Sequence, residues 1–163
     1  MLIKKRKILS KKEKKPLLTD LNKEYGDTIS SSIGLSTMLE EVITDEGTVI
    51  IKNGKIWFFY SDDKIISSIY FLRESGFELP EVVVDIGAIK FITNGADVMS
   101  PGVVTFSEEI RKGTLVVIKE EKANSIIGVG SSLINSEDFN KSQKGKVVKL
   151  RHHLKDKMWS FRL

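Results

Sequence analysis

Two adjacent histidines, His152 and His153, are the only imidazole side chains in this sequence, which also has no cysteine. Adjacent residues of a strand point to opposite faces, so this pair cannot hold one metal ion together. We expect each to be structural or to lie at the rim of a site. The absence of cysteine excludes disulfides, cysteine-ligated zinc and thiol nucleophiles, and it is compatible with a reducing compartment. We therefore expect neither a metal nor a cofactor.

Other chemically suggestive groups do not form a catalytic set. Gly128–Ser132 has two glycines of a dinucleotide-binding loop but lacks the third, and no long helix is predicted after it. The pairs Asp62-Asp63, Glu108-Glu109 and Glu120-Glu121 fall in predicted turns, where solvation explains them better than acid–base catalysis. The aromatic run Trp57–Tyr60 could stack bases, although core packing of a hairpin accounts for it better. We expect a protein that is not an enzyme.

Basic residues gather at both ends of the chain. Met1–Glu24 holds nine Lys/Arg against three Asp/Glu, and Lys144–Leu163 holds seven against one, although the whole chain has a net charge of only +4. Such clusters can neutralise phosphates, and the acidic middle would orient the protein on a polyanion. Solvation of charged ends explains the same pattern equally well, so charge alone leaves both interpretations open.

The N-terminal segment does not have the pattern of an export signal. Met1–Lys7 has the basic character of a signal start, but four lysines follow where its apolar core would lie: Lys11, Lys12, Lys14 and Lys15. No apolar run approaches the roughly 20 residues that span a bilayer. We expect a cytoplasmic protein. Its segment Lys4–Lys15 is expected to be partly a solvated helix face and partly a mobile end, whose charges attract any polyanion.

The elements that must position these residues begin with a helix. Ser10-Lys11-Lys12-Glu13 has the capping-box pattern, and Gly26 is a plausible helix stop. Pro16 is expected to kink this helix or to shift its start. The helical spacing predicts one buried face, made of Leu17, Leu18, Leu21 and Tyr25, with Lys11, Lys14, Lys15 and Lys23 outside.

A β-rich stretch follows the helix. Thr48–Lys52 and Lys55–Tyr60 flank Asn53-Gly54, a dipeptide typical of a two-residue hairpin turn. Ile65–Leu72 is apolar enough for a further strand. The Gly76–Pro80 stretch then breaks regular structure, which predicts a domain boundary near Pro80.

The second half has short β-branched runs between glycines and charged turns. Strands are expected at Val82–Asp85, Gly113–Lys119, Ser125–Gly130, Lys146–His152 and Met158–Phe161, with a short helix at Ser136–Lys141. This pattern favours a small barrel. The predicted fold is α+β, with an N-terminal helix-plus-sheet domain over residues 1–81 and a barrel domain over residues 82–163.

The stretch Val84–Val103 resembles the opening of a PUA domain. It reads as a strand, a short helix ending in Gly95-Ala96, and a strand leading to Pro101-Gly102-Val103. Gly95 can adopt a left-handed conformation, and the small Ala96 allows a ligand backbone to approach closely. The resemblance continues, in order, through Gly113–Ile118, Ile126–Gly130, Ser136–Asp138, Lys144–Lys146 and His152–Trp159. It implies a PUA pseudo-barrel that binds RNA.

Three segments narrow the resemblance: Leu9–Glu13, Leu79–Asp85 and His152–Trp159. Together they are similar to the malignant-T-cell-amplified-sequence and ligatin group and its archaeal relatives. The resemblance implies a non-catalytic protein that binds structured RNA, rRNA or tRNA, and acts in translation re-initiation or recycling. Its implied partners are the small ribosomal subunit and an initiation-factor-like protein. Two alternatives stay open, namely an accessory subunit for tRNA or rRNA modification and a protein-interaction adaptor.

The resemblance also implies an RNA-facing surface in two parts. The first lies at the helix end and the following strand, at Lys90, Asn94, Gly95, Ala96, Asp97, Val98 and Met99. The second lies on the last strands, at Lys149, Arg151, His152 and Lys157. Because Lys149 and Arg151 are two residues apart, a strand would place them on one face, and Lys157 could return to it after a turn at Lys155-Asp156. This strand is expected to supply the specific part of RNA affinity.

Overall fold

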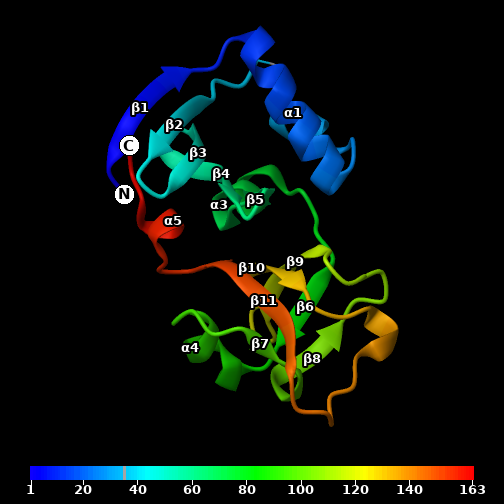
Figure 1. The fold of residues 1–163 in the computed structure, drawn as a ribbon. Helices are drawn as coiled ribbons and strands as arrows, with labels where there is room; N and C mark the ends of the chain where they lie inside the picture. The colour runs from blue at the N-terminus through cyan, green and yellow to red at the C-terminus, as the bar shows by residue number, and fades with distance from the viewer. Residues whose placement is uncertain (35) are drawn as a thin grey trace. The chain divides into compact units, whose positions relative to one another are not determined.

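The computed structural model describes residues 1–34 and 36–163. The chain forms two compact units, one made of residues 1–77 and 160–163 and the other of residues 78–159. Each unit has its own sheet (Figure 1), one of five strands and one of six. The predicted mixture of helices and sheets is confirmed.

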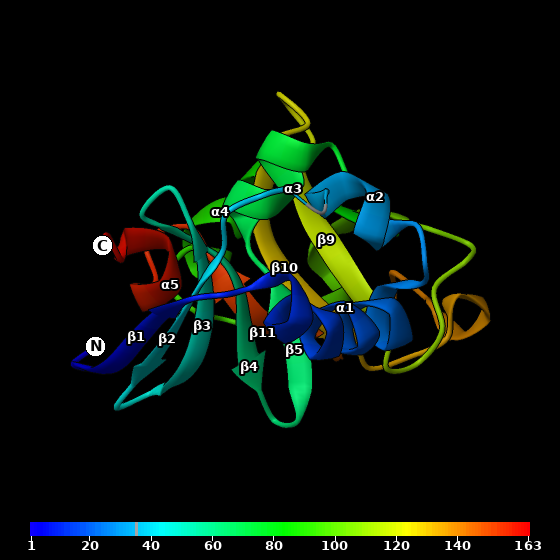
Figure 2. The same ribbon diagram turned by 90° about the horizontal axis from the view of Figure 1, so that it is seen from above.

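The first unit is an antiparallel sheet with three helices. Its elements are β1 Ile3–Ile8, α1 Lys11–Tyr25, α2 Ile29–Ile33, β2 Glu40–Thr44, β3 Gly47–Lys52, β4 Lys55–Ser61, β5 Lys64–Ser67 and α3 Ile69–Ser75. The strands follow one another in space as in the sequence, from β1 at one edge to β5 at the other (Figure 2). The core between sheet and helices is rich in large apolar side chains such as Trp57, Phe58 and Phe71.

Helix α1 begins where the capping box predicts. Ser10 Oγ accepts the backbone N–H of Glu13 at 3.2 Å, and the Glu13 carboxylate accepts the N–H of Ser10 at 2.9 Å. Pro16 lies inside the helix and does not shift its start. Gly26 ends the helix with a φ of 85°, and its N–H donates to the carbonyl oxygen of Asn22.

Two predictions about the basic N-terminal residues are wrong. Lys14 is buried instead of exposed, because its Nζ reaches back to donate to the carbonyl oxygen of Thr37. The part of Lys4–Lys15 that precedes the helix is not a mobile end, since Lys4–Ile8 belong to strand β1, where Arg6 lies opposite Val42 of β2. The lysines of this segment are therefore held on a strand.

The hairpin between β3 and β4 is confirmed, with positive φ angles of 49° at Asn53 and 78° at Gly54. The predicted strand Ile65–Leu72 is correct only in its first half. Strand β5 ends at Ser67, and the next residues form α3 because Ser68 Oγ accepts the N–H of Phe71 and caps the helix.

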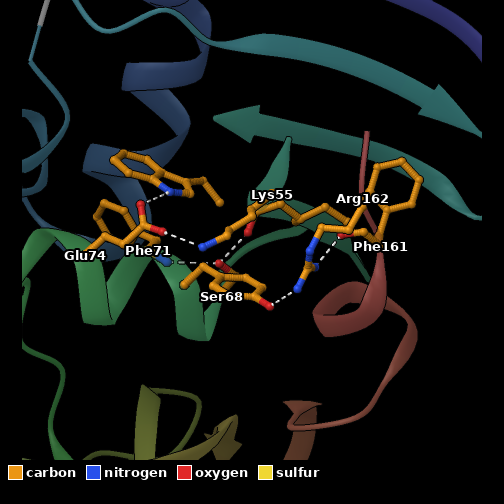
Figure 3. A network of polar contacts seen from close by, with 9 residues as sticks. Lys55, Ser68, Phe71, Glu74, Phe161 and Arg162 are labelled. Atoms are coloured by element: carbon orange, nitrogen blue, oxygen red, sulfur yellow. Dashed lines mark hydrogen bonds and ion pairs between the residues drawn. The ribbon is translucent and has the colours of Figure 1, made fainter. Parts of the chain in front are cut away.

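The last residues of the chain are bound to this first unit (Figure 3). Arg162 donates to the hydroxyl of Tyr70 in α3, and its guanidinium lies 5.1 Å from the centre of that ring. The N–H of Leu163 donates to the carbonyl of Gly54 at 3.0 Å. The N-terminal unit thus includes residues from both ends of the sequence.

The second unit is a six-stranded, barrel-like sheet in the order β7-β11-β10-β9-β6-β8, in which only β6 and β9 are parallel. Its elements are β6 Glu81–Val84, η1 Ile86–Ala88, α4 Ile89–Ile92, β7 Val98–Met99, η2 Ser100–Gly102, β8 Val103–Phe106, β9 Leu115–Glu120, β10 Ile126–Ser132, η3 Ser136–Asp138 and β11 Lys146–His153. Branched apolar side chains such as Val82, Ile118 and Val148 fill its core.

Two elements of the second half differ from prediction. The expected helix Ser136–Lys141 is only the 3-10 turn η3. The expected strand Met158–Phe161 is instead the short helix α5, Lys157–Ser160. Asp156 Oδ1 accepts the N–H of Trp159 at 2.8 Å, the contact of a helix N-cap, which turns the chain away from an extended conformation.

Candidate nucleic-acid interface

A pocket of about 550 Å³ opens in the second unit, between η1, helix α4 and the segment Ala96–Gly102. Its lining is mainly apolar. Phe91 and Met99, two of the lining residues, are 57% and 45% exposed. Large exposed apolar side chains around a concavity mark a binding site more often than a structural feature. The pocket can therefore receive a flat, partly apolar group.

Local backbone contacts shape this pocket. Asp85 caps η1, since its Oδ1 accepts the N–H of Ala88 at 2.9 Å. Two backbone hydrogen bonds end helix α4. The N–H of Gly95 donates to the carbonyl oxygen of Ile92 at 3.0 Å, and the N–H of Ala96 donates to the carbonyl oxygen of Phe91 at 2.9 Å. Gly95 has a φ of 98°, a conformation that residues with a Cβ rarely adopt. The predicted left-handed glycine is confirmed.

The segment after the pocket lies along strand β11. Val98 of β7 pairs with Val148, and Met99 pairs with Lys146. Asp97 is held at this junction because its Oδ1 accepts the N–H of Leu150 at 2.8 Å while its Oδ2 lies 3.3 Å from Lys146 Nζ. Strand β7, whose residues Val98 and Met99 line the pocket, therefore lies beside the basic strand β11 in the same sheet (Figure 1).

Lys149 and Arg151 lie on this strand, although not by simple alternation. In the pairing of β10 with β11, Val129 lies opposite His152, and the next residue, Gly130, lies opposite Leu150. Arg151 therefore has no partner in this ladder and is the inserted residue of a bulge. Lys149 pairs with Ser131, and Arg151 Nε donates to Ser131 Oγ at 3.1 Å. Both cationic side chains are therefore directed to the same side, near Ser131.

The two histidines have different environments. His152 is fully buried, and its Nδ1 lies 2.8 Å from Asp156 Oδ2. Burial of the Asp156 carboxyl raises its pKa, but the hydrogen bond and charge of His152 and the N–H groups of Trp159 and His153 outweigh this and lower the pKa below 3.8. This pair fixes the turn that precedes α5.

His153 is half-buried and lies beside Gly95, where a Cβ would be 3.6 Å from the imidazole Nε2. Its Nδ1 is 2.7 Å from the carbonyl oxygen of Leu154, which can only accept, so Nδ1 carries the proton. The imidazole at the end of β11 is thus oriented by Leu154 and lies next to the α4 end.

The structure brings many of the predicted residues together. Ala96, Asp97, Val98 and Met99 line the pocket, and Gly95 immediately precedes them. Lys90, Asn94, Lys149 and Lys157 are exposed, Arg151 is partly exposed, and the side chains of Val98 and His152 are buried. Val98 and His152 thus act through backbone or packing and do not present a side chain at the surface.

The sequence prediction missed three residues of this surface: Phe91, Lys146 and His153. Phe91 could have been found from helical spacing, because Ile89 and Ile92 pack inward and leave Phe91 outside, with Lys90 Nζ 5.1 Å from its ring centre. His153 was missed because the resemblance assigned its neighbour His152 to the surface, although alternation from Lys149 leads to Arg151 and His153 and not to the buried His152.

Within residues 1–34 and 36–163, no group of three or more His, Asp or Glu side chains could hold a metal ion. Among the same residues, no helix combines the length and apolar character needed to cross a membrane.

Comparisons with known proteins agree with this geometry. Residues 80–154 match the PUA domain family. The chain is 37% identical over 162 residues to the uncharacterized protein MJ1432 of Methanocaldococcus jannaschii, and the match covers 99% of each. It is 31% identical to the hypothetical protein PH0734.1 of Pyrococcus horikoshii, whose crystal structure it matches with a TM-score of 0.77 over 95% of this chain and 98% of that one.

Eukaryotic relatives match a smaller part. Translation machinery-associated protein 20 of Saccharomyces cerevisiae is 33% identical over 115 residues, which cover 67% of this chain and 64% of that protein. Malignant T-cell-amplified sequence 1 of Rattus norvegicus is 30% identical over 115 residues, 68% of this chain and 63% of that protein. The chain thus spans just under two thirds of these relatives. It belongs to the PUA-domain proteins of the malignant-T-cell-amplified-sequence type and groups with their archaeal relatives.

Proposed function

We propose that this protein is a non-catalytic RNA-binding protein of the translation machinery that docks on rRNA or tRNA through the pocket and strand β11. The family match over residues 80–154 supports RNA binding, and the name of the yeast relative supports a place in translation. Within that role, we favour action at the small ribosomal subunit, in re-initiation or recycling, together with an initiation-factor-like protein.

The observation that carries this proposal is the junction of an apolar pocket with a cationic strand. An unstacked base offers a flat, partly apolar face, and exposed aromatic side chains such as Phe91 stack on such faces. Lys149 and Arg151, directed to one side of β11, are suited to phosphates of the same strand of RNA. The pocket alone would not distinguish RNA from other apolar ligands, and the cationic strand alone would not distinguish it from other anions.

The backbone around Gly95 and Ala96 supplies a close approach that side chains would block. Gly95 is exposed and has no Cβ, and Ala96 in the pocket wall has only a methyl group. A sugar or base edge can then reach the main chain of this segment. We further propose that RNA binding belongs to the unit of residues 78–159, and that the unit of residues 1–77 and 160–163 is a separate domain with another task.

The test is RNA binding measured at several salt concentrations with the full chain, using tRNA and small-subunit rRNA. Replacing Lys149 and Arg151 by Ala should lower the slope of log affinity against log salt by roughly 1.5, because up to two phosphate contacts are lost. Phe91→Ala should weaken binding about fivefold or more at an unchanged slope, since stacking is not ionic. Lys112→Ala removes an exposed charge elsewhere in the unit and is the matched control.

Two results would contradict the proposal. One is a double variant that keeps the salt slope of the parent, and the other is a Lys112→Ala variant that loses as much affinity as Lys149→Ala. Co-sedimentation with small ribosomal subunits tests the place in translation. A bound fraction that is the same for the parent and the Phe91→Ala variant would show that the pocket has no part in it.

A further inference from the structure

Among residues 1–34 and 36–163, no strand pairs with the outer edge of β1. Strand β1 pairs with β2 on one side and is the first strand of the five-stranded sheet, as Figures 1 and 2 both show. Five of its six residues are exposed. An open edge of this kind presents backbone donors and acceptors to which an extended segment can pair.

The ladder identifies which backbone groups face outward. The N–H of Leu9 donates to the carbonyl of Leu39 at 2.9 Å, so the backbone of Leu9 faces β2. In an antiparallel ladder this orientation alternates, which turns Lys7 toward β2 and Arg6 and Ile8 away from it. The N–H and C=O groups of Arg6 and Ile8 are therefore available along the open edge.

The side chains of β1 divide between the two faces of the sheet. Cross-strand pairing places Ile3, Arg6 and Ile8 on one face, because a bulge between Ile3 and Lys5 shifts the alternation. Ile3 is 42% exposed and Ile8 is 62% exposed, so this row offers two uncovered apolar groups around a cation.

The opposite face of β1 is basic. It carries Lys5 and Lys7, and Lys4 lies at the bulge. Lys7 is already bound to Glu13 and Glu41, and Arg6 on the other face to Glu40. Among the described residues, neither Lys4 nor Lys5 forms an ion pair within 4 Å, and both side chains are exposed. The pKa of Asp45 is lowered mainly by the N–H of Leu2, and the charge of Lys4 contributes to this lowering.

The other edge of the same sheet is closed by contrast. The hydroxyl of Tyr25 accepts the N–H of Ser67 and donates to the carbonyl of Ile65, both at 2.7 Å, so one phenol satisfies two outward groups of β5. The fold thus seals β5 against pairing and leaves β1 open.

We propose that β1 binds an extended segment of a partner protein in which apolar and acidic residues alternate, adding it to the sheet as a sixth strand. The apolar residues of that segment cover Ile3 and Ile8, while its carboxylates face Lys4 and Lys5. The same charge repels a second copy of β1, since like charges on neighbouring strands are destabilising. The edge therefore selects an acidic partner over self-association.

The test uses a fluorescein-labelled ten-residue peptide of alternating valine and glutamate, with the full chain. Ile8→Pro removes the outward N–H, a change that an edge strand tolerates because the group faces solvent. Ile8→Ala is the control, because it loses the side chain and keeps the N–H. Affinity should fall about fivefold or more in Ile8→Pro relative to Ile8→Ala, as expected for one lost hydrogen bond.

A second variant and a spectroscopic readout make the test independent of any folding defect. Lys4→Glu with Lys5→Glu changes only exposed side chains and should weaken the peptide about tenfold, less so at high salt. In the parent, the peptide should slow hydrogen exchange of the Arg6 and Ile8 amides. The proposal is overturned if the peptide does not bind, if Ile8→Pro and Ile8→Ala bind it equally, or if oligouridylate protects these amides and the peptide does not.

Discussion

Gly95 is the backbone position on which the shape of the pocket depends most directly. Its φ of 98° lies outside the wells open to residues with a Cβ, whereas an added Cβ would meet only His153 Nε2 at 3.6 Å, an ordinary contact. A substitution is therefore costly through backbone strain and not through a clash. Gly95→Ala should cost about 1–3 kcal/mol of unfolding free energy, and Gly95→Val more, because a branched Cβ restricts the backbone further.

For a chain of 163 residues, this loss corresponds to a fall in Tm of about 3–10 °C. Thermal and denaturant unfolding of the variant measure it directly. Gly145→Ala is the matched control, since Gly145 has no positive φ and an added Cβ would meet nothing within 4 Å. That substitution should be neutral or stabilising by up to about 1 kcal/mol, because it only restricts the unfolded chain.

RNA binding is measured on the same variants, well below their Tm. Relief of the strain should displace the Ala96 N–H from the Phe91 carbonyl, to which it donates at 2.9 Å, and so open the pocket wall. Affinity should therefore fall for Gly95→Val and stay unchanged for Gly145→Ala. If Gly95→Ala is as stable as the parent, the strain argument is refuted. If Gly95→Val folds and binds RNA like the parent, the site has been misplaced.

Three further predictions concern stability. Asp156→Asn should cost about 1–3 kcal/mol at pH 7, because an amide replaces the charged carboxylate that is bound to His152. Because the folded pKa of Asp156 lies below 3.8, the difference in stability from the parent should persist to pH 5. It should shrink in denaturation curves only below about pH 4. Gly130→Ala should lose about 1–3 kcal/mol or more in a urea titration, because the new Cβ would lie 2.5 Å from Val148 Cγ1. Deleting Met1–Lys7 should lower the Tm by several degrees, since it removes most of β1, and an unchanged Tm would contradict that strand pairing.

Local rules predicted the parts of the fold that local chemistry controls. The capping box at Ser10 and the Asn53-Gly54 turn depend on contacts within four residues, and both are present as expected. Ile65–Leu72 shows the limit of such rules, because its composition suits a strand throughout. Only the hydroxyl of Ser68, which binds the N–H of Phe71 and also the carbonyl of Ile56, divides it into strand and helix.

Long-range contacts account for what the sequence could not show. Lys14 has a position on α1 that suits exposure, and it is buried because the carbonyl of Thr37, 23 residues away, accepts its Nζ. Residues 3–8 read as a lysine-rich tail, and they form a strand because the edge of β2 is there to receive them. Neither partner can be identified from spacing within the segment itself.

For the candidate site, the resemblance located the region, and the bulge in β11 decided the details. Strict alternation from Lys149 would place Arg151 and His153 on the same face. The extra residue at Arg151 breaks this count: His152 pairs with Val129 and is fully buried, and His153 lies beside Gly95. A bulge inserts one residue without any required residue type at this position, which is why the assignment of the two histidines needed the structure.

The proposed interface assigns different tasks to its two parts, and Asp97 joins them. The cations of β11 provide attraction that depends on salt and little on sequence, whereas the pocket discriminates by the shape of what enters it. A carboxylate beside an RNA site would repel phosphate, but that of Asp97 is bound to the N–H of Leu150 and to Lys146. Its charge is offset while its two contacts hold the pocket wall against the strand. The distance between the stacking site and the phosphate site is then set by the protein before RNA arrives, which lowers the ordering cost of binding.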